Sequence, residues 1–173
     1  MHILIVPSEH YVTKELPLAS IFQHQQAHAL KEGGFKVGVV SAGFVPFRMN
    51  FKTYSYPPFE QDNGINIYRC YKKTFIPGRI SIKIFSKWFV DLYLKKFKKY
   101  IGLHGKPDIV HAHNCLHAGV VALKIKKQFD IPFVITEHST AYARGLISNQ
   151  QGKLTKVILK NADAITVVST ELG

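Results

Sequence analysis

The sequence predicts a domain of the α/β class, with a mostly parallel sheet between two layers of helices (a three-layer αβα arrangement). Short apolar runs such as His2–Val6 and Phe133–Glu137 are typical of strands that are buried on both faces. These runs alternate along the chain with segments of helical periodicity. That alternation predicts a parallel sheet, because each return to a parallel strand needs a crossover connection, usually a helix.

Six segments are predicted as strands because each is short, rich in apolar residues and bounded by residues that favour turns. A turn signal, Asn63-Gly64, stands directly before the third of them. The segment Ala42–Gly64 contains three prolines and is expected to be an irregular loop. The predicted strands are His2–Val6, Val37–Ser41, Ile65–Cys70, Asp108–His113, Phe133–Glu137 and Ala164–Val168.

Four segments are predicted as helices because apolar residues recur in them at intervals of three and four. The first, with Leu18 and Phe22 near its apolar face, is followed by Gly33-Gly34, which suits a left-handed helix end. Because the chain ends directly after its last strand, we expect residues 1–173 to be a single domain of a longer protein. The predicted helices are Leu18–Lys31, Ile80–Ile101, Ala118–Phe129 and Gln150–Asn161.

The chain is strongly basic. Its 23 Lys and Arg residues outnumber 11 Asp and Glu residues, which gives a formal net charge of +12. This surplus favours nucleic acid, anionic membrane lipid or a small anionic ligand as a partner, although a solvated basic face would also explain it. No module that reads nucleic acid is visible, so nucleic acid is not expected. The two cysteines, Cys70 and Cys115, form no disulfide framework and favour a reducing compartment.

The N-terminus reads as a first strand and not as a signal peptide, and no apolar run approaches the roughly 20 residues of a spanning helix. These features predict a cytoplasmic protein. The basic helix Ile80–Ile101 suits the surface of an anionic membrane, which would make the protein peripheral to it. The alternative is an ordinary helix whose apolar stripe packs on the sheet. The expected membrane contacts are Trp88, Lys95, Lys98 and Lys99.

Ligands of open parallel sheets bind outside the carboxyl ends of the strands. Among the residues at these ends are His113 and His138, whose side chains can donate or accept a proton near neutral pH. Because their strands are predicted to be parallel neighbours, residues 113–114 and 137–139 are expected to emerge side by side. The candidate ends are Pro7–Tyr11, His113–Cys115, Glu137–Thr140 and Ser169.

Two familiar kinds of ligand site are not predicted. No G-x-G-x-x-G or P-loop pattern follows the first strand. The glycines that would let a pyrophosphate approach the backbone closely are therefore missing from this loop. His111 and His113 share one face of a strand and could ligate zinc with His117, which would suit a metal-dependent hydrolase. No cysteine or carboxylate completes a recognised spacing there, and no metal or cofactor is expected.

Three runs, taken in order and at their spacing, resemble family 4 glycosyltransferases. They are Pro107–Asn114 (PDIVHAHN), Ile131–Ser139 (IPFVITEHS) and Ala162–Ser169 (ADAITVVS). The resemblance implies the N-terminal, acceptor-binding domain of a GT-B enzyme, in which two Rossmann-like domains face a cleft. Such an enzyme would be a retaining, hexosyltransferase-like enzyme that moves a sugar from a nucleoside-diphosphate sugar to a glycan or lipid-linked acceptor. A C-terminal donor domain with a paired-glutamate motif would complete it, so the isolated chain is expected to be inactive.

The resemblance also implies site residues. His138 matches the family's functional histidine in its Thr-x-His context, and it is the expected catalytic residue. The resemblance places the first loop, with His10 and Tyr11, and His113-Asn114 on the acceptor side. Position alone adds a further four residues to the predicted acceptor site, namely Glu137, Ser139, Tyr142 and Arg144. The alternative is a stand-alone α/β module that binds an anionic ligand or a protein partner.

Overall fold

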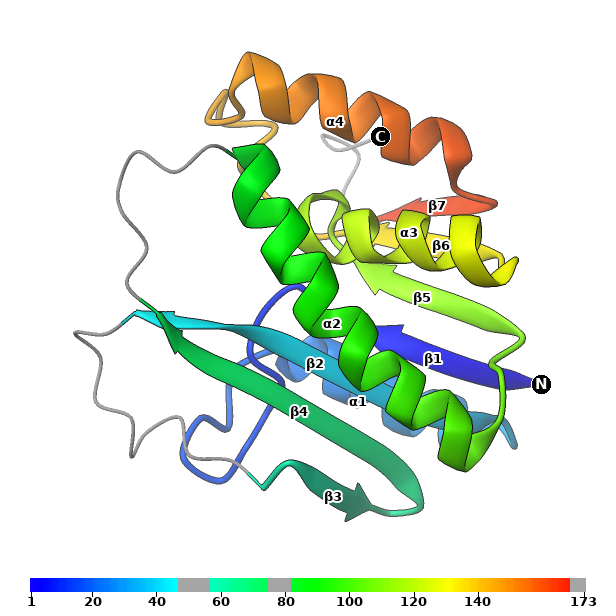
Figure 1. Cartoon of the computed structure of the whole chain (residues 1–173). Helices are drawn as coiled ribbons and strands as arrows, with labels where there is room; N and C mark the ends of the chain where they lie inside the picture. The colour runs from blue at the N-terminus through cyan, green and yellow to red at the C-terminus, as the bar shows by residue number, and fades with distance from the viewer. Residues whose placement is uncertain (47–56, 75–81, 169–173) are drawn as a thin grey trace.

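The computed structural model describes residues 1–46, 57–74 and 82–168. They form a seven-stranded sheet with helices on both faces (Figure 1). The helices are α1 (Ile21–Glu32), α2 (Ile82–His104), α3 (Val120–Phe129) and α4 (Asn149–Asn161). The strands are β1 (His2–Val6), β2 (Lys36–Pro46), β3 (Phe59–Asp62), β4 (Ile65–Thr74), β5 (Ile109–His113), β6 (Phe133–Glu137) and β7 (Ala164–Val167).

The strand order is β3-β4-β2-β1-β5-β6-β7, and among the described strands β3 and β4 alone pair antiparallel. The predicted α/β class with a mostly parallel sheet is therefore confirmed. The chain first builds outward from β1 to β2 and β4, and then returns to place β5 on the other side of β1. This reversal between β1 and β5 is a topological switch point, where open α/β sheets usually bind ligands.

The two faces of the sheet are covered by different helices, because each crossover has a fixed hand. In Figure 1, α1 lies behind the sheet, and α2 and α3 lie in front of it. The front core contains Tyr93 and Phe97 of α2 packed with Leu4 and Ile135 of the sheet. The smaller core behind contains Ala27 of α1 together with strand residues such as Ile5, Val39 and Ile67. Alternating strand residues thus reach opposite cores, as the period of a strand requires.

One prediction about the loop Ala42–Gly64 is wrong. β2 continues to Pro46 because it pairs in parallel with β4 from Gly38 onward, as far as Thr74. Phe59–Asp62 then forms the antiparallel edge strand β3, and the predicted Asn63-Gly64 turn joins it to β4 with positive φ at both residues. Residues 47–56 of the predicted loop lie outside the described residues.

The predicted apolar face of the first helix is also wrong, although its glycine stop is confirmed. Leu18 lies before α1, and both Leu18 and Phe22 are exposed, while Gln23 and Ala27 form the buried face. Gly34 has a φ of 83° and its N–H donates to the carbonyl of Lys31, so the helix ends as predicted.

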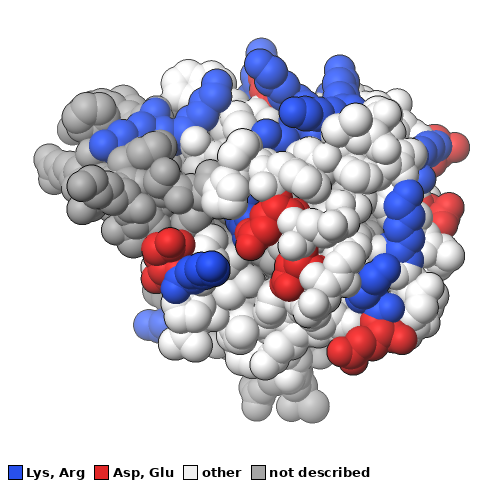
Figure 2. Space-filling view, turned by 90° about the horizontal axis from the view of Figure 1, so that it is seen from below, with Lys and Arg blue, Asp and Glu red and all other residues white. Residues whose placement is uncertain are grey.

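Helix α2 packs its apolar stripe on the sheet and turns its lysines to solvent. Phe89, Leu92, Tyr93 and Phe97 are buried, whereas Lys95, Lys98 and Lys99 are exposed. Figure 2 views the molecule from below, and basic side chains gather along its upper margin, which corresponds to the front of Figure 1 where α2 lies. No helix within the described residues is both long enough and apolar enough to cross a membrane.

Candidate functional site

The side chain of Asn114 joins the carboxyl ends of three strands at the switch point. Its Nδ2 donates to Oγ of Ser8, just after β1, at 2.8 Å. Its Oδ1 accepts from the backbone N–H of His138, just after β6, also at 2.8 Å. Asn114 itself follows β5 with a φ of 69° and a ψ of 143°, a conformation that few residues other than glycine adopt. Unusual backbone of this kind is commonly found at functional sites.

Glu137 makes a second link across the same edge. This buried carboxylate accepts from the backbone N–H of Cys115 through Oε2 and from that of Ser139 through Oε1, both at 2.8 Å. β5 and β6 pair in parallel, with His113 opposite Thr136. The prediction that residues 113–114 and 137–139 emerge side by side is therefore confirmed.

Three histidine rings form a stack on one face of β5 and β6, which we name the imidazole column (His111, His113 and His138). Ring centroids of His111 and His113 are 4.5 Å apart, and those of His113 and His138 are 5.2 Å apart, with nearly parallel planes. His111 Nε2 lies 2.7 Å from Oγ1 of Thr136, and His113 Nδ1 lies 2.9 Å from His138 Nε2. Each ring is thus held by a hydrogen bond.

Burial keeps the imidazole column uncharged. Burial, with a smaller contribution from neighbouring histidines, lowers the pKa of His113 to about 2 and that of His111 to about 4. Burial also lowers the pKa of His138, although Glu137 opposes that shift. All three rings are therefore neutral at pH 7, and each carries one N–H.

The hydrogen bonds of His113 fix where these protons sit. Its Nε2 is buried and finds no hydrogen-bond partner among the described residues. A buried N–H without a partner is disfavoured, so we assign the proton of His113 to Nδ1, which donates to Nε2 of His138. A neutral His138 then carries its own proton on Nδ1, where it is a hydrogen-bond donor.

Two cavities open at this edge of the sheet and share Glu137 and Tyr142 in their walls. One, of about 310 Å³, is bounded by polar residues that include Ser8, Asn114 and Ser139. The other, of about 240 Å³, extends toward α4 and β7 and is more apolar, with Leu159, Ile165 and Val167 in its wall. Burial raises the pKa of Tyr142 and of Cys115 to about 12, so both remain protonated at neutral pH. Cys115 is therefore not a thiolate nucleophile.

Comparison with known proteins identifies the family. The model of Glycosyltransferase Family 4 matches residues 19–173. The chain belongs to this family. The family 4 match contains every residue of the candidate site except those of the first loop.

One relative and two solved structures extend this finding. The "Putative teichuronic acid biosynthesis glycosyltransferase TuaC" of Bacillus subtilis (strain 168) is 28% identical over an alignment of 137 residues, and the match covers 75% of this chain and 34% of that protein. Arabidopsis thaliana UGT89C1 complexed with UDP aligns over 97% of this chain and 42% of its own, with a TM-score of 0.52 and 10% identity. A protein described as a putative UDP-N-acetylglucosamine 2-epimerase from Listeria monocytogenes aligns over 98% and 40%, with a TM-score of 0.52 and 14% identity.

These likenesses differ in what they show. At identities of 10% and 14%, the two solved structures show the fold alone. The family 4 chain spans only about a third of the length of the Bacillus relative, and about two fifths of the length of the two solved structures.

The structure brings some of the predicted site residues of this family 4 domain together and leaves others apart. His113, Asn114, Glu137, His138 and Ser139 lie together, as described above. Tyr142 joins them through its place in both cavities, and its hydroxyl lies 2.9 Å from Oγ1 of Thr155. Ser169 lies outside the described residues.

Three predicted acceptor residues lie apart from this group. Tyr11 is fully buried in the core beneath α1. His10 stacks on Tyr71 at 4.3 Å and borders a third cavity of about 130 Å³, which shares Ser8, Glu9 and His117 with the polar cavity. Arg144 is exposed in the turn after β6 and does not border the cavities described above.

The zinc hypothesis for His111, His113 and His117 is not supported. The ring of His117 lies against Phe89, with centroids 5.5 Å apart, and its backbone has a φ of 63° that separates it from the imidazole column. Within the described residues, these three histidines do not bring a set of ligand atoms close enough together for a metal.

Sequence reasoning missed the role of Ser8 and the central position of Asn114. Ser8 was available as a polar residue at the carboxyl end of the first strand. No sequence pattern, however, predicts that an amide from β5 would reach it across the switch point.

Proposed function

We propose that this domain forms the acceptor-binding side of a glycosyltransferase that uses a nucleoside-diphosphate sugar as donor. The observation that carries the proposal is the pair of hydrogen bonds from the Asn114 side chain to Ser8 and His138, which we name the Asn114 junction. It lies at the switch point, beside the polar cavity and the neutral His138. Hydroxyl groups of a sugar need such paired donors and acceptors, here Ser8, Asn114 and Ser139. The neighbouring apolar cavity suits the ring face of a sugar or the first part of a lipid carrier.

The reaction would join an acceptor oxygen to the anomeric carbon of the donor sugar. The bond from that carbon to the diphosphate breaks, the nucleoside diphosphate leaves with the electron pair, and the proton of the acceptor hydroxyl passes to the departing diphosphate oxygen. We propose that the anomeric configuration is retained, as the family resemblance implies. His138 would donate its Nδ1–H to an oxygen of the reacting sugar, which positions that sugar while charge develops on the leaving group.

The donor would be bound mainly by another part of the protein. The loop after β1 offers no glycine to bring a diphosphate close to the backbone. The name of the Bacillus relative, a teichuronic acid biosynthesis glycosyltransferase, supports a glycan or lipid-linked acceptor. The UDP in the Arabidopsis structure supports a nucleotide as part of the donor.

The first test asks whether the isolated chain transfers sugar. We expect no release of UDP from UDP-glucose or UDP-N-acetylglucosamine, with or without a water-soluble prenyl diphosphate sugar as acceptor. We expect the prenyl diphosphate sugar alone to bind and to shift the amide resonances of Asn114 and Ser139. Turnover by the isolated chain would contradict the proposal that another part of the protein binds the donor. Absence of any binding would contradict the proposed acceptor site.

The second test is His138→Ala in the full-length enzyme. Loss of a positioned donor is expected to lower kcat by about 100-fold, with a smaller change in KM for the acceptor. His104→Ala is the matched control, because His104 is a half-buried histidine at the C-terminal end of α2, away from the site. Rates near wild type for His138→Ala would remove it from the catalytic residues.

We propose as well that α2 contacts the cytoplasmic face of an anionic membrane. Trp88 is exposed next to a row of exposed lysines, Lys95, Lys98 and Lys99, although most of the apolar stripe packs on the sheet. Lysines near such a surface contribute about 1 kcal/mol each. Sedimentation with phosphatidylglycerol vesicles should weaken in Trp88→Ala and Lys95→Glu. Equal pelleting of wild type and both variants would contradict this contact.

A further inference from the structure

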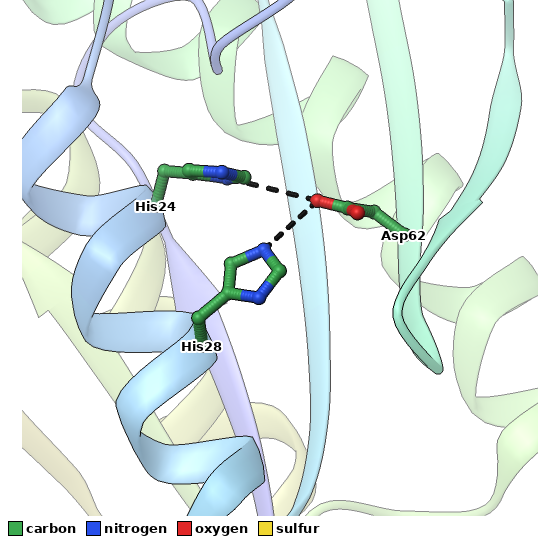
Figure 3. A group of neighbouring side chains, drawn as sticks. All are labelled: His24, His28 and Asp62. Carbon is green, nitrogen blue, oxygen red and sulfur yellow. Dashed lines mark hydrogen bonds and ion pairs between the residues drawn. The ribbon is translucent and has the colours of Figure 1, made fainter.

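Two histidines and an aspartate meet on the α1 side of the molecule, away from the candidate site. His24 and His28 stand one turn apart on α1 and point toward Asp62, which lies in β3 directly before the turn into β4 (Figure 3). We name these three residues the histidine–aspartate cluster. Because β4 is parallel to β2, its amino end lies at the edge of the sheet opposite to the strand ends that form the candidate site.

We propose that the histidine–aspartate cluster binds a divalent transition metal ion, with Zn²⁺ as the expected ion. His28 Nε2 lies 2.9 Å and His24 Nδ1 lies 3.9 Å from the same oxygen, Oδ2 of Asp62. All three ligand atoms lie within 4.8 Å of one another. Ligand atoms of a tetrahedral zinc site are about 3.3 Å apart when the bonds are about 2.0 Å long, so small side-chain movements would complete the site.

The spacing of the residues also suits zinc. Histidines at positions i and i+4 of a helix present both imidazoles on one face, which is how several helical zinc sites are built. Two nitrogen ligands and one carboxylate leave a fourth position for water or another ligand. Imidazole ligands favour Zn²⁺, Ni²⁺ and Cu²⁺, whereas Mg²⁺ and Ca²⁺ prefer oxygen ligands, so the latter two are not expected to bind.

The surroundings leave the cluster accessible to an ion. The side chains of His24, His28 and Asp62 are 25%, 21% and 33% exposed. Nearby Arg69 forms an ion pair with Glu60 at 2.6 Å and donates to the carbonyl of Val12. The metal would replace two hydrogen bonds, the 2.9 Å bond between His28 Nε2 and Asp62 Oδ2 and the longer 3.4 Å bond between His24 Nδ1 and the hydroxyl of Tyr11.

A bound metal would connect two segments that are 34 residues apart in the sequence. It would fix the β3–β4 turn, at the edge of the sheet, to α1, which covers the same edge from behind. Metal binding is therefore expected to stabilise the folded chain, because the unfolded chain has no preformed site.

The test is calorimetric titration of the chain, purified without a polyhistidine tag and freed of metal with EDTA. We expect Zn²⁺ to saturate at one ion per chain and to raise the melting temperature, and Mg²⁺ to do neither. His28→Gln and Asp62→Asn should each weaken Zn²⁺ binding by at least about tenfold. Asp91→Asn on the exposed face of α2 is the matched control and should bind as wild type does.

Cobalt provides a measurement that does not depend on the variants. Co²⁺ bound to the wild-type chain should show the intense visible absorption of a four-coordinate site with nitrogen ligands. Zinc should displace it in a ratio of one to one. Absence of stoichiometric binding, a spectrum like that of the hydrated ion, or variants that bind as tightly as Asp91→Asn would each overturn the proposal.

Discussion

The imidazole column and the histidine–aspartate cluster contain the same side chain in opposite surroundings. His113 in the column is 0% exposed, stacks between the rings of His111 and His138, and hydrogen-bonds to His138. His24 and His28 in the cluster remain partly exposed and face a carboxylate. Both groups come from a short repeat of histidines, His111 and His113 on a strand or His24 and His28 on a helix.

The difference teaches that the neighbours of a histidine repeat, and not the repeat itself, decide its chemistry. Where the rings are largely buried and stacked on one another, they stay neutral and serve as hydrogen-bonding groups for a polar ligand. Where a carboxylate and solvent are both available, the same rings can bind a cation. Four measurements would test this contrast between the two groups of histidines.

The largest expected effect is on stability when the buried column loses a ring. His113→Ala should lower the free energy of unfolding by about 3 kcal/mol, measured by urea denaturation, because it leaves a cavity in a closely packed region. His113→Phe, which fills the space with a slightly larger ring and removes the unpartnered nitrogen, should lose less than half as much. A loss below about 1 kcal/mol for His113→Ala would mean that the column is not closely packed.

The next effect concerns the junction that holds the column in place. Asn114→Ala removes the partners of the Ser8 hydroxyl and of the His138 N–H, and should lower stability by about 2 kcal/mol. Asn114→Gly should lose less, because glycine adopts a positive φ without strain. Asn149→Ala, at an exposed position, should change stability by no more than about 0.5 kcal/mol. Equal losses at positions 114 and 149 would contradict the junction.

The third effect is on the pH dependence of stability. The pKa of His113 lies near 2 in the folded chain and near 6.5 in the unfolded chain, so the unfolded chain binds more protons between these values. Stability should therefore fall as the pH falls below about 6.5, by about 1.4 kcal/mol per pH unit for His113. His111 adds to this slope down to about pH 4.

His113→Phe removes one of these titrating groups. The slope of unfolding free energy between pH 6 and pH 5 should decrease by about 1.4 kcal/mol per pH unit in this variant. An unchanged slope would show that His113 is not the buried neutral ring described here.

The smallest effect is expected in the histidine–aspartate cluster without metal. His28→Gln should change stability by less than about 0.5 kcal/mol in EDTA, because the pair that it breaks is partly exposed. A difference between His28→Gln and wild type should then appear when Zn²⁺ is added. A loss in EDTA as large as that of His113→Ala would make the cluster a structural element instead of a metal site.

The core strands could be predicted from the sequence because burial on both faces is visible in composition. His2–Val6 and Phe133–Glu137 have the bounds that were predicted. β3 could not be predicted, because Phe59–Asp62 is short, largely polar and defined only by its pairing with β4. The exposed Phe22 shows the same limit, since periodicity alone does not say which face of α1 meets the sheet.

The part of the candidate site that follows from the order of the strands could be predicted from the sequence. Parallel neighbours place His113 and His138 at one edge, and their proximity followed from that rule. The burial of Tyr11 could not be predicted, because it depends on the path of the loop after β1. The histidine–aspartate cluster was missed because Asp62 falls in a segment that was expected to be irregular.

The Asn114 junction has a mechanical consequence. One amide group restrains Ser8 and His138 together, so the loops that follow β1 and β6 cannot separate unless a hydrogen bond breaks first. An incoming molecule would meet a wall whose shape is already set before contact. If the site closes around a ligand, the moving part would then be a segment other than these two loops, and it would close against them.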